Sequence, residues 1–140
     1  MTKLPQWEIR LFDFISNSQN KSFKWGKWDC CIFCIEAVKA MTGKEITKVK
    51  WNNKLEALLF IKENGTTINQ ATSKYLKKVG FKVVDKNFIT AGDVVLLKDI
   101  HNNNEQLMGI CTGNLIACVC EEGLTYRQNQ NAVKVWRING

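Results

Sequence analysis

The chain has 140 residues, of which 45% are hydrophobic and 24% are charged. This composition excludes a disordered chain, and the length is enough for one compact domain over residues 1–140. No apolar run approaches the roughly 18 residues that cross a bilayer, and residues 1–10 lack the apolar stretch of a secretory signal, so we expect neither a membrane span nor a signal peptide. The formal charge of +7 comes mostly from scattered lysines; because proteins that read nucleic acid favour arginine, we expect no nucleic-acid partner.

The first half of the chain has the periodicity of amphipathic helices. Apolar residues at helical spacing predict a first helix over residues 4–15, with Pro5 in its first turn. The second helix has the clearest pattern, because Asp29 is a natural N-cap and Gly43 suits the C-terminal cap. Between these caps, a continuous stripe of residues spaced for one buried face consists of Cys30, Phe33, Cys34, Ala37, Val38 and Met41.

Two further helices are predicted in the middle of the chain. Apolar residues indicate a third helix over residues 51–62. Thr67 and Gln70 have the spacing of a capping box, which predicts a fourth helix that ends at Gly80.

From residue 81 the pattern changes to short apolar runs between turn residues, which indicates strands. The Asn-rich segment 101–105 is the expected hairpin connection between two of them. The fold class that we expect is therefore α+β, with N-terminal helices packed on a C-terminal antiparallel sheet. The predicted strands are 81–84, 93–98, 106–112, 115–120 and 132–138.

The segment that leads into the second helix has the composition of a reactive site. Gly26 permits close backbone approach, and Trp25 and Trp28 are candidate walls of a cleft. A thiol in the first turn of a helix lies near unpaired N–H groups and the positive end of the helix dipole, which stabilise a thiolate. Cys30 is therefore a candidate nucleophile, and Gly26 and Asp29 join the two tryptophans in the candidate binding cleft. The alternative is that Cys30 is a small core residue on an apolar stripe.

Six cysteines and a single histidine limit the available chemistry. A Cys–His catalytic pair must use His101. Zinc held by four thiolates is an alternative, but Cys31 and Cys34 lie inside a predicted helix rather than on zinc knuckles, and Cys118 and Cys120 lie on a strand. A thioredoxin-like C-x-x-C fits poorly, because no strand precedes it. We therefore expect no metal and no cofactor.

Several short motifs occur in a familiar order. Trp-Gly followed by Asp-Cys at residues 25–30, opening a helix that ends at Gly43, resembles the nucleophile segment of NlpC-type cysteine peptidases, papain-like enzymes that cut cell-wall peptides. Residues 92–97 resemble the Gly-Asp strand of that family, and residues 107–113 resemble its next strand, which in active members opens with the catalytic histidine. Together with Trp-Arg-Ile at 136–138, the pattern is most similar to a small family encoded by phages and prophages near tail-tip genes.

The sequence departs from the family where the base is expected. Leu107 stands at the position of the catalytic histidine, and a leucine side chain cannot accept a proton. The residue that orients the imidazole falls near Ala117 or Cys118, which cannot do so. The resemblance therefore implies a degenerate, inactive peptidase fold that serves as a structural or assembly part of a phage tail tip. Its implied partners are other tail proteins and a cell-wall peptide, and its implied location is the virion, or the host cytoplasm before assembly.

Two alternatives stay open. One is an active cysteine peptidase or amidase, with Cys30 as nucleophile, His101 as a relocated base, and backbone N–H groups near Cys30 as the oxyanion site. The other is a phage-encoded protein that binds a host factor.

Overall fold

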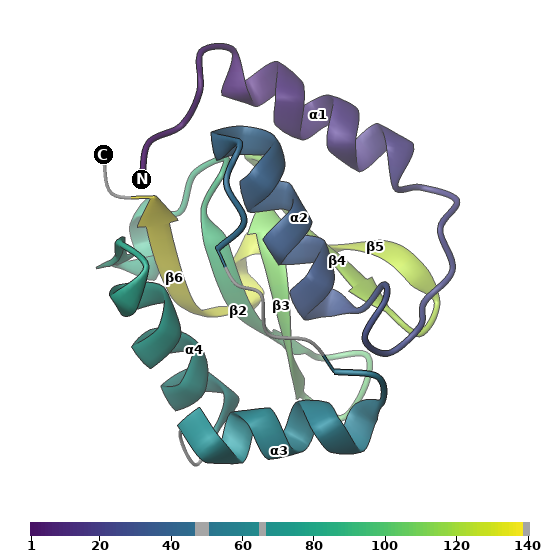
Figure 1. The fold of residues 1–140 in the computed structure, drawn as a ribbon. Helices are drawn as coiled ribbons and strands as arrows, with labels where there is room; N and C mark the ends of the chain where they lie inside the picture. Colours follow the sequence, from purple (N-terminus) through teal and green to yellow (C-terminus); the bar gives the residue numbers. More distant parts are fainter. Residues whose placement is uncertain (47–50, 65–66, 139–140) are drawn as a thin grey trace.

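The structure is a computed structural model, which describes residues 1–46, 51–64 and 67–138. Within these residues it has four α-helices followed by six β-strands (Figure 1). The helices are α1 (Trp7–Asn17), α2 (Cys30–Thr42), α3 (Lys54–Asn64) and α4 (Ile68–Lys78). The strands are β1 (Phe81–Val84), β2 (Val94–Asp99), β3 (Glu105–Cys111), β4 (Leu115–Cys120), β5 (Gly123–Gln128) and β6 (Ala132–Ile138).

The strands form one antiparallel sheet in the order β1-β6-β2-β3-β4-β5. The last strand, β6, inserts between β1 and β2, so the end of the described chain lies inside the sheet rather than at its edge. The α+β class with helices preceding an antiparallel sheet is confirmed, as is the hairpin connection between β2 and β3. Strand β5 is absent from the strands predicted by sequence.

The helices build a second layer on the sheet. Helix α2 packs on β3 and β4, α1 packs on α2, and α4 lies beside β1 with α3 against it (Figure 1). The predicted stripe of α2 is buried, and Phe33, Val38 and Met41 are fully inaccessible to solvent. Burial of each such side chain stabilises the fold by about 1.5–3 kcal/mol. Among the described helices, none is long and apolar enough to span a membrane.

The ends of α2 follow the sequence prediction, whereas the start of α1 does not. The Asp29 carboxylate caps α2 by accepting from the Ile32 N–H, and Gly43 ends the helix with a left-handed φ of 76°. Helix α1 begins only at Trp7. The preceding Leu4 donates its N–H to the Met41 carbonyl at 2.8 Å, which fastens this segment to the end of α2 instead of continuing α1.

The two faces of β2 contribute to two separate apolar clusters. Val94 and Leu96 face the helices, in the cluster that also contains Trp136. Val95 and Leu97 point the other way, into a smaller cluster on the opposite face of the sheet. Because side chains alternate along a strand, this strand is buried on both sides and holds the centre of the sheet.

Candidate functional site

The loop before α2 closes on itself through backbone hydrogen bonds. The Trp28 N–H donates to the Lys24 carbonyl at 2.8 Å, and the Lys24 N–H donates back to the Trp28 carbonyl at 3.0 Å. At the tip of this loop, Gly26 adopts a left-handed φ of 79°. A Cβ atom there would lie 1.8 Å from the Trp51 carbonyl oxygen, so the chain passes through a space that only glycine fits.

Asp29 organises this loop from the inside. Its carboxylate is 1% exposed and accepts from the N–H groups of Ile32 and Gly26, each at 2.9 Å, and from the Trp51 indole N–H at 2.6 Å. A buried carboxylate needs such donors to offset its lost hydration. The oxygens of Asp29, which the sequence places in the candidate cleft, are thus occupied in holding the start of α2.

The two tryptophans of the loop have different roles. Trp28 is 6% exposed and packs against Phe14 and Phe33, with ring centroids 6.1 and 5.8 Å apart, so it belongs to the core and not to a cleft wall. Trp25 is half-buried and meets the Phe23 ring edge-on at 5.2 Å. The rings of Phe23 and Trp25 line the pocket at the start of α2.

This pocket, which we call the Cys30 pocket, has a volume of about 200 Å³. It brings together Cys30 from α2, His101 from the turn between β2 and β3, and Leu107 from β3. Three glutamates that the sequence analysis did not single out also line it, namely Glu105, Glu121 and Glu122.

Cys30 is 9% exposed, and its thiol lies next to a second thiol. Its Sγ is 4.0 Å from Sγ of Cys31. A hydrogen bond from Cys31 lowers the pKa of Cys30; burial opposes this effect, and the backbone N–H of Met108 reinforces it. The same pairing, together with burial, raises the pKa of Cys31 well above its usual range. Of the two adjacent thiols, Cys30 is therefore the one suited to ionise, and it is the one that lines the pocket.

His101 shares the pocket with Cys30 but is not paired with it. The residue is exposed, and its backbone N–H donates to Oδ1 of Asp99 at 3.1 Å. Among the residues that the structure describes, no hydrogen bond joins the imidazole to the Cys30 thiol. The two predicted catalytic residues thus lie in one pocket without forming a nucleophile–base contact.

Leu107 lies on β3 beside the thiol. It pairs with Leu97 on β2 and lines the Cys30 pocket. The backbone N–H of the next residue, Met108, stabilises the Cys30 thiolate. An aliphatic side chain therefore occupies this side of the pocket. Ala117 and Cys118, on the neighbouring β4, are fully buried and do not line the pocket.

A buried ion pair between Arg127 and Asp99 forms part of the wall of the Cys30 pocket. Arg127 on β5 donates through Nε to Oδ1 of Asp99 at 3.1 Å, and Asp99 is 2% exposed. Burial alone would raise the pKa of Asp99, but Arg127 and the His101 backbone N–H together hold it below its usual range. Sequence reasoning missed this pair because it joins residues 28 apart and because β5 was not predicted.

The cysteines outside the pocket have no shared ligand geometry. All six thiols are free, and the described residues contain no group of three or more metal-binding side chains placed around one point. Cys118 is buried in the sheet, and burial raises the pKa of its thiol to about 12. Cys31 and Cys34 line a separate cavity on another side of α2.

Comparison with known proteins identifies one family. A family model described as "Domain of unknown function (DUF6950)" matches residues 2–138, which include the loop before α2 and every strand described above. No curated protein matches the chain. Because the match covers nearly the whole sequence, the chain belongs to the DUF6950 family.

Proposed function

We propose that this chain is a papain-like domain of the NlpC type that has lost peptidase activity and acts as a structural or assembly protein of a phage tail tip. The observation that carries the loss of activity is the place of Leu107, which lines the Cys30 pocket where the resemblance puts the catalytic histidine. A hydrolase without its general base loses about 100- to 10,000-fold in rate.

The arrangement around α2 supports the papain-like part of the proposal. Cys30 is the first residue of a helix that packs on an antiparallel sheet. The strand beside its thiol is β3, and by the resemblance this is the strand that carries the catalytic histidine in active NlpC-type peptidases. The loop that presents Cys30 is fixed by Gly26 and Asp29, two of the residues on which the resemblance depends.

The Cys30 pocket keeps features that suit binding without cleavage. Phe23 and Trp25 supply an aromatic wall, and Glu105 and Glu122 supply hydrogen-bond acceptors. A groove of this kind suits a peptide or a cell-wall fragment, whose backbone amides donate and whose carbon skeleton packs on aromatic rings.

Mass spectrometry of purified phage particles from a strain that encodes the chain tests the tail-tip role. We expect the protein in a fixed stoichiometry to known tail proteins, and in the same fraction after the tails are separated from the capsids. Its absence from particles, while it is abundant in the producing cells, would contradict the role.

An active cysteine hydrolase is a second candidate, favoured by the shared pocket of Cys30 and His101 and by the lowered pKa of Cys30. The Cys30 thiolate would attack an amide carbonyl, His101 would protonate the departing amine, and water would then release the acyl group from the sulfur. This candidate requires Cys30→Ala to abolish the hydrolysis of a cell-wall peptide and His101→Ala to lower it at least about 100-fold, with circular dichroism unchanged. Peptide that stays intact with the wild-type protein would eliminate it.

A further inference from the structure

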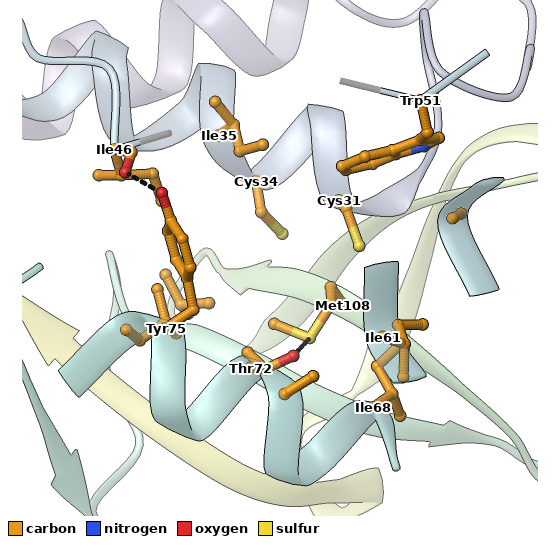
Figure 2. A pocket seen from close by; sticks show the side chains of 14 residues that line it. Cys31, Cys34, Ile35, Ile46, Trp51, Ile61, Ile68, Thr72, Tyr75 and Met108 are labelled. Atoms are coloured by element: carbon orange, nitrogen blue, oxygen red, sulfur yellow. Dashed lines mark hydrogen bonds between the residues drawn. The ribbon is translucent and has the colours of Figure 1, made fainter. Parts of the chain in front are cut away.

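A second cavity lies on the other side of α2 and is lined by residues of α2, α3, α4 and the sheet (Figure 2). Its volume is about 110 Å³, and it shares no lining residue with the Cys30 pocket among the described residues. Branched aliphatic side chains from separate elements form its walls, including Ile35 on α2, Ile61 on α3 and Val94 on β2. It is therefore a separate site, formed where the two helical pairs meet above the sheet.

The polar groups of the cavity wall are engaged with the protein. Tyr75 donates its hydroxyl to the Ile46 carbonyl at 3.0 Å, and the Thr72 hydroxyl points to Sδ of Met108 at 3.9 Å (Figure 2). The Trp51 indole N–H is bound to Asp29. Of the described residues that line the cavity, none carries a charge. A ligand that brought a charge or an unmet hydrogen-bonding group into this space would lose its hydration without compensation.

Three sulfur atoms distinguish this cavity from an ordinary aliphatic one. Cys31 and Cys34 project into it from α2, and Met108 faces them from β3 (Figure 2). Sulfur atoms make favourable contacts with aromatic rings, at about 5 Å and often at the ring edge. The walls thus offer sulfur on two sides, and aliphatic carbon together with the rings of Trp51 and Tyr75 on the others. Because aromatic rings make favourable contacts with both sulfur and other rings, this lining favours an aromatic ring over a saturated group of the same size.

The volume sets the size of the ligand. A dry apolar cavity of about 150 Å³ in another protein takes up benzene or xenon. The cavity here is somewhat smaller, and α3, which forms part of its wall, packs chiefly on α4, so a small shift of one helix would enlarge it. We propose that this cavity binds a single uncharged aromatic ring of about the size of benzene or toluene. The proposal does not depend on the function of the Cys30 pocket.

Thermal unfolding with benzene tests the proposal. At about ten times the dissociation constant, we expect benzene to raise the Tm of the wild-type protein by about 3–5 °C. Ala71→Leu adds a side chain inside the cavity and should abolish the shift, whereas Ala40→Leu, on α2 but outside the cavity, should retain it. Cyclohexane at the same concentration should give a smaller shift, and benzoate none.

A second measurement keeps the test decisive if Ala71→Leu does not fold. In methyl-resolved NMR spectra of the wild-type protein, benzene should move the resonances of Ile61 and Ile68, which line the cavity, and leave those of Val84 and Ile89, on the other face of the sheet, in place. The proposal is overturned if benzene moves neither the Tm nor the cavity methyl groups, if it moves both sets of methyl groups alike, or if benzoate matches benzene. A larger shift with cyclohexane than with benzene would contradict the assignment of an aromatic ring.

Discussion

Replacing Gly26 with alanine tests how tightly the loop before α2 is held. The new Cβ would lie 1.8 Å from the Trp51 carbonyl oxygen, whereas Cβ atoms in proteins essentially never come within 3.0 Å of such an atom. The two backbone segments must therefore separate by about 1.2 Å. Both segments donate hydrogen bonds to the same carboxylate oxygen of Asp29, at 2.9 Å from the Gly26 N–H and 2.6 Å from the Trp51 indole.

The size of the effect follows from these contacts. A hydrogen bond to a charged group contributes about 1.5–3 kcal/mol, and a residue other than glycine in the left-handed conformation costs about 1–2 kcal/mol. Loss of one hydrogen bond to Asp29 together with this strain gives a decrease of about 2.5–5 kcal/mol in the free energy of unfolding of Gly26→Ala. For a chain of this length, this corresponds to a fall in Tm of about 9–17 °C.

The control is Gly80→Ala, because Gly80 also has a left-handed φ, of 101°, but no described atom lies within 4 Å of the position that a Cβ would take there. This variant should show the conformational strain alone, about 1–2 kcal/mol. Both variants would be unfolded in urea and followed by circular dichroism. If the free energies of unfolding of Gly26→Ala and Gly80→Ala decrease by the same amount within about 0.5 kcal/mol, the close contact between residue 26 and the Trp51 carbonyl does not hold the loop.

Three further changes test other contacts of the site by the same urea titration. Trp51→Phe removes the indole donor from Asp29 and should cost about 1.5–3 kcal/mol, so a loss below about 0.5 kcal/mol would show that this hydrogen bond is dispensable. Arg127→Met leaves the Asp99 carboxylate buried without its cation and should cost about 3–5 kcal/mol at pH 7. The pKa of Asp99 is lower in the folded protein than in the unfolded chain, where it is about 3.9. The pair therefore stabilises the fold fully at pH values above about 3.9, and this stabilisation is lost as the pH falls through the folded pKa. An Arg127→Met variant that loses as much free energy of unfolding at pH 3 as at pH 7 would contradict this. Gly109→Ala brings a Cβ to 2.6 Å from a side chain on β4 and should cost about 1–3 kcal/mol, and an unchanged midpoint would refute the close approach of β3 and β4.

Features of the fold that depend on neighbouring residues could be predicted from the sequence. Helix α2 is the best case, because its cap at Asp29, its end at Gly43 and its buried stripe all lie within one helix and need no knowledge of distant contacts. The cap of α4 at Thr67 is confirmed for the same reason, since its side chain accepts from an N–H only three residues away.

The sequence predictions are wrong where contacts between residues far apart in the chain determine the structure. Apolar spacing predicts that Trp51 belongs to a helix, but it precedes α3 and binds Asp29, 22 residues earlier in the chain. Strand β5 carries no continuous apolar run, because it lies at the edge of the sheet and only its first residue, Gly123, is buried. Without β5, the partner of Asp99 could not be identified.

The candidate site was predictable in part. The position of Cys30 in the first turn of α2 follows from the local sequence. That Trp28 turns into the core while Trp25 lines the pocket depends on the left-handed turn at Gly26, which spacing alone does not reveal. His101 reaches the same pocket as Cys30 because β2 and β3 bring their connecting turn to this end of α2, a matter of tertiary arrangement.

Alkylation of Cys30 with and without His101 tests the central claim, that the pocket holds an acidic thiol with no base. Iodoacetamide would be applied to the folded wild-type protein and to His101→Ala across a range of pH, with fragment ions used to separate Cys30 from Cys31. We expect Cys30 to react with an apparent pKa below the ordinary value of about 8.5, and with the same profile in both proteins, because Cys31 and the Met108 N–H stabilise its thiolate. A pKa of about 8.5 or above would contradict the acidic thiol, and a profile that moves to higher pH in His101→Ala would show that the histidine serves as its base.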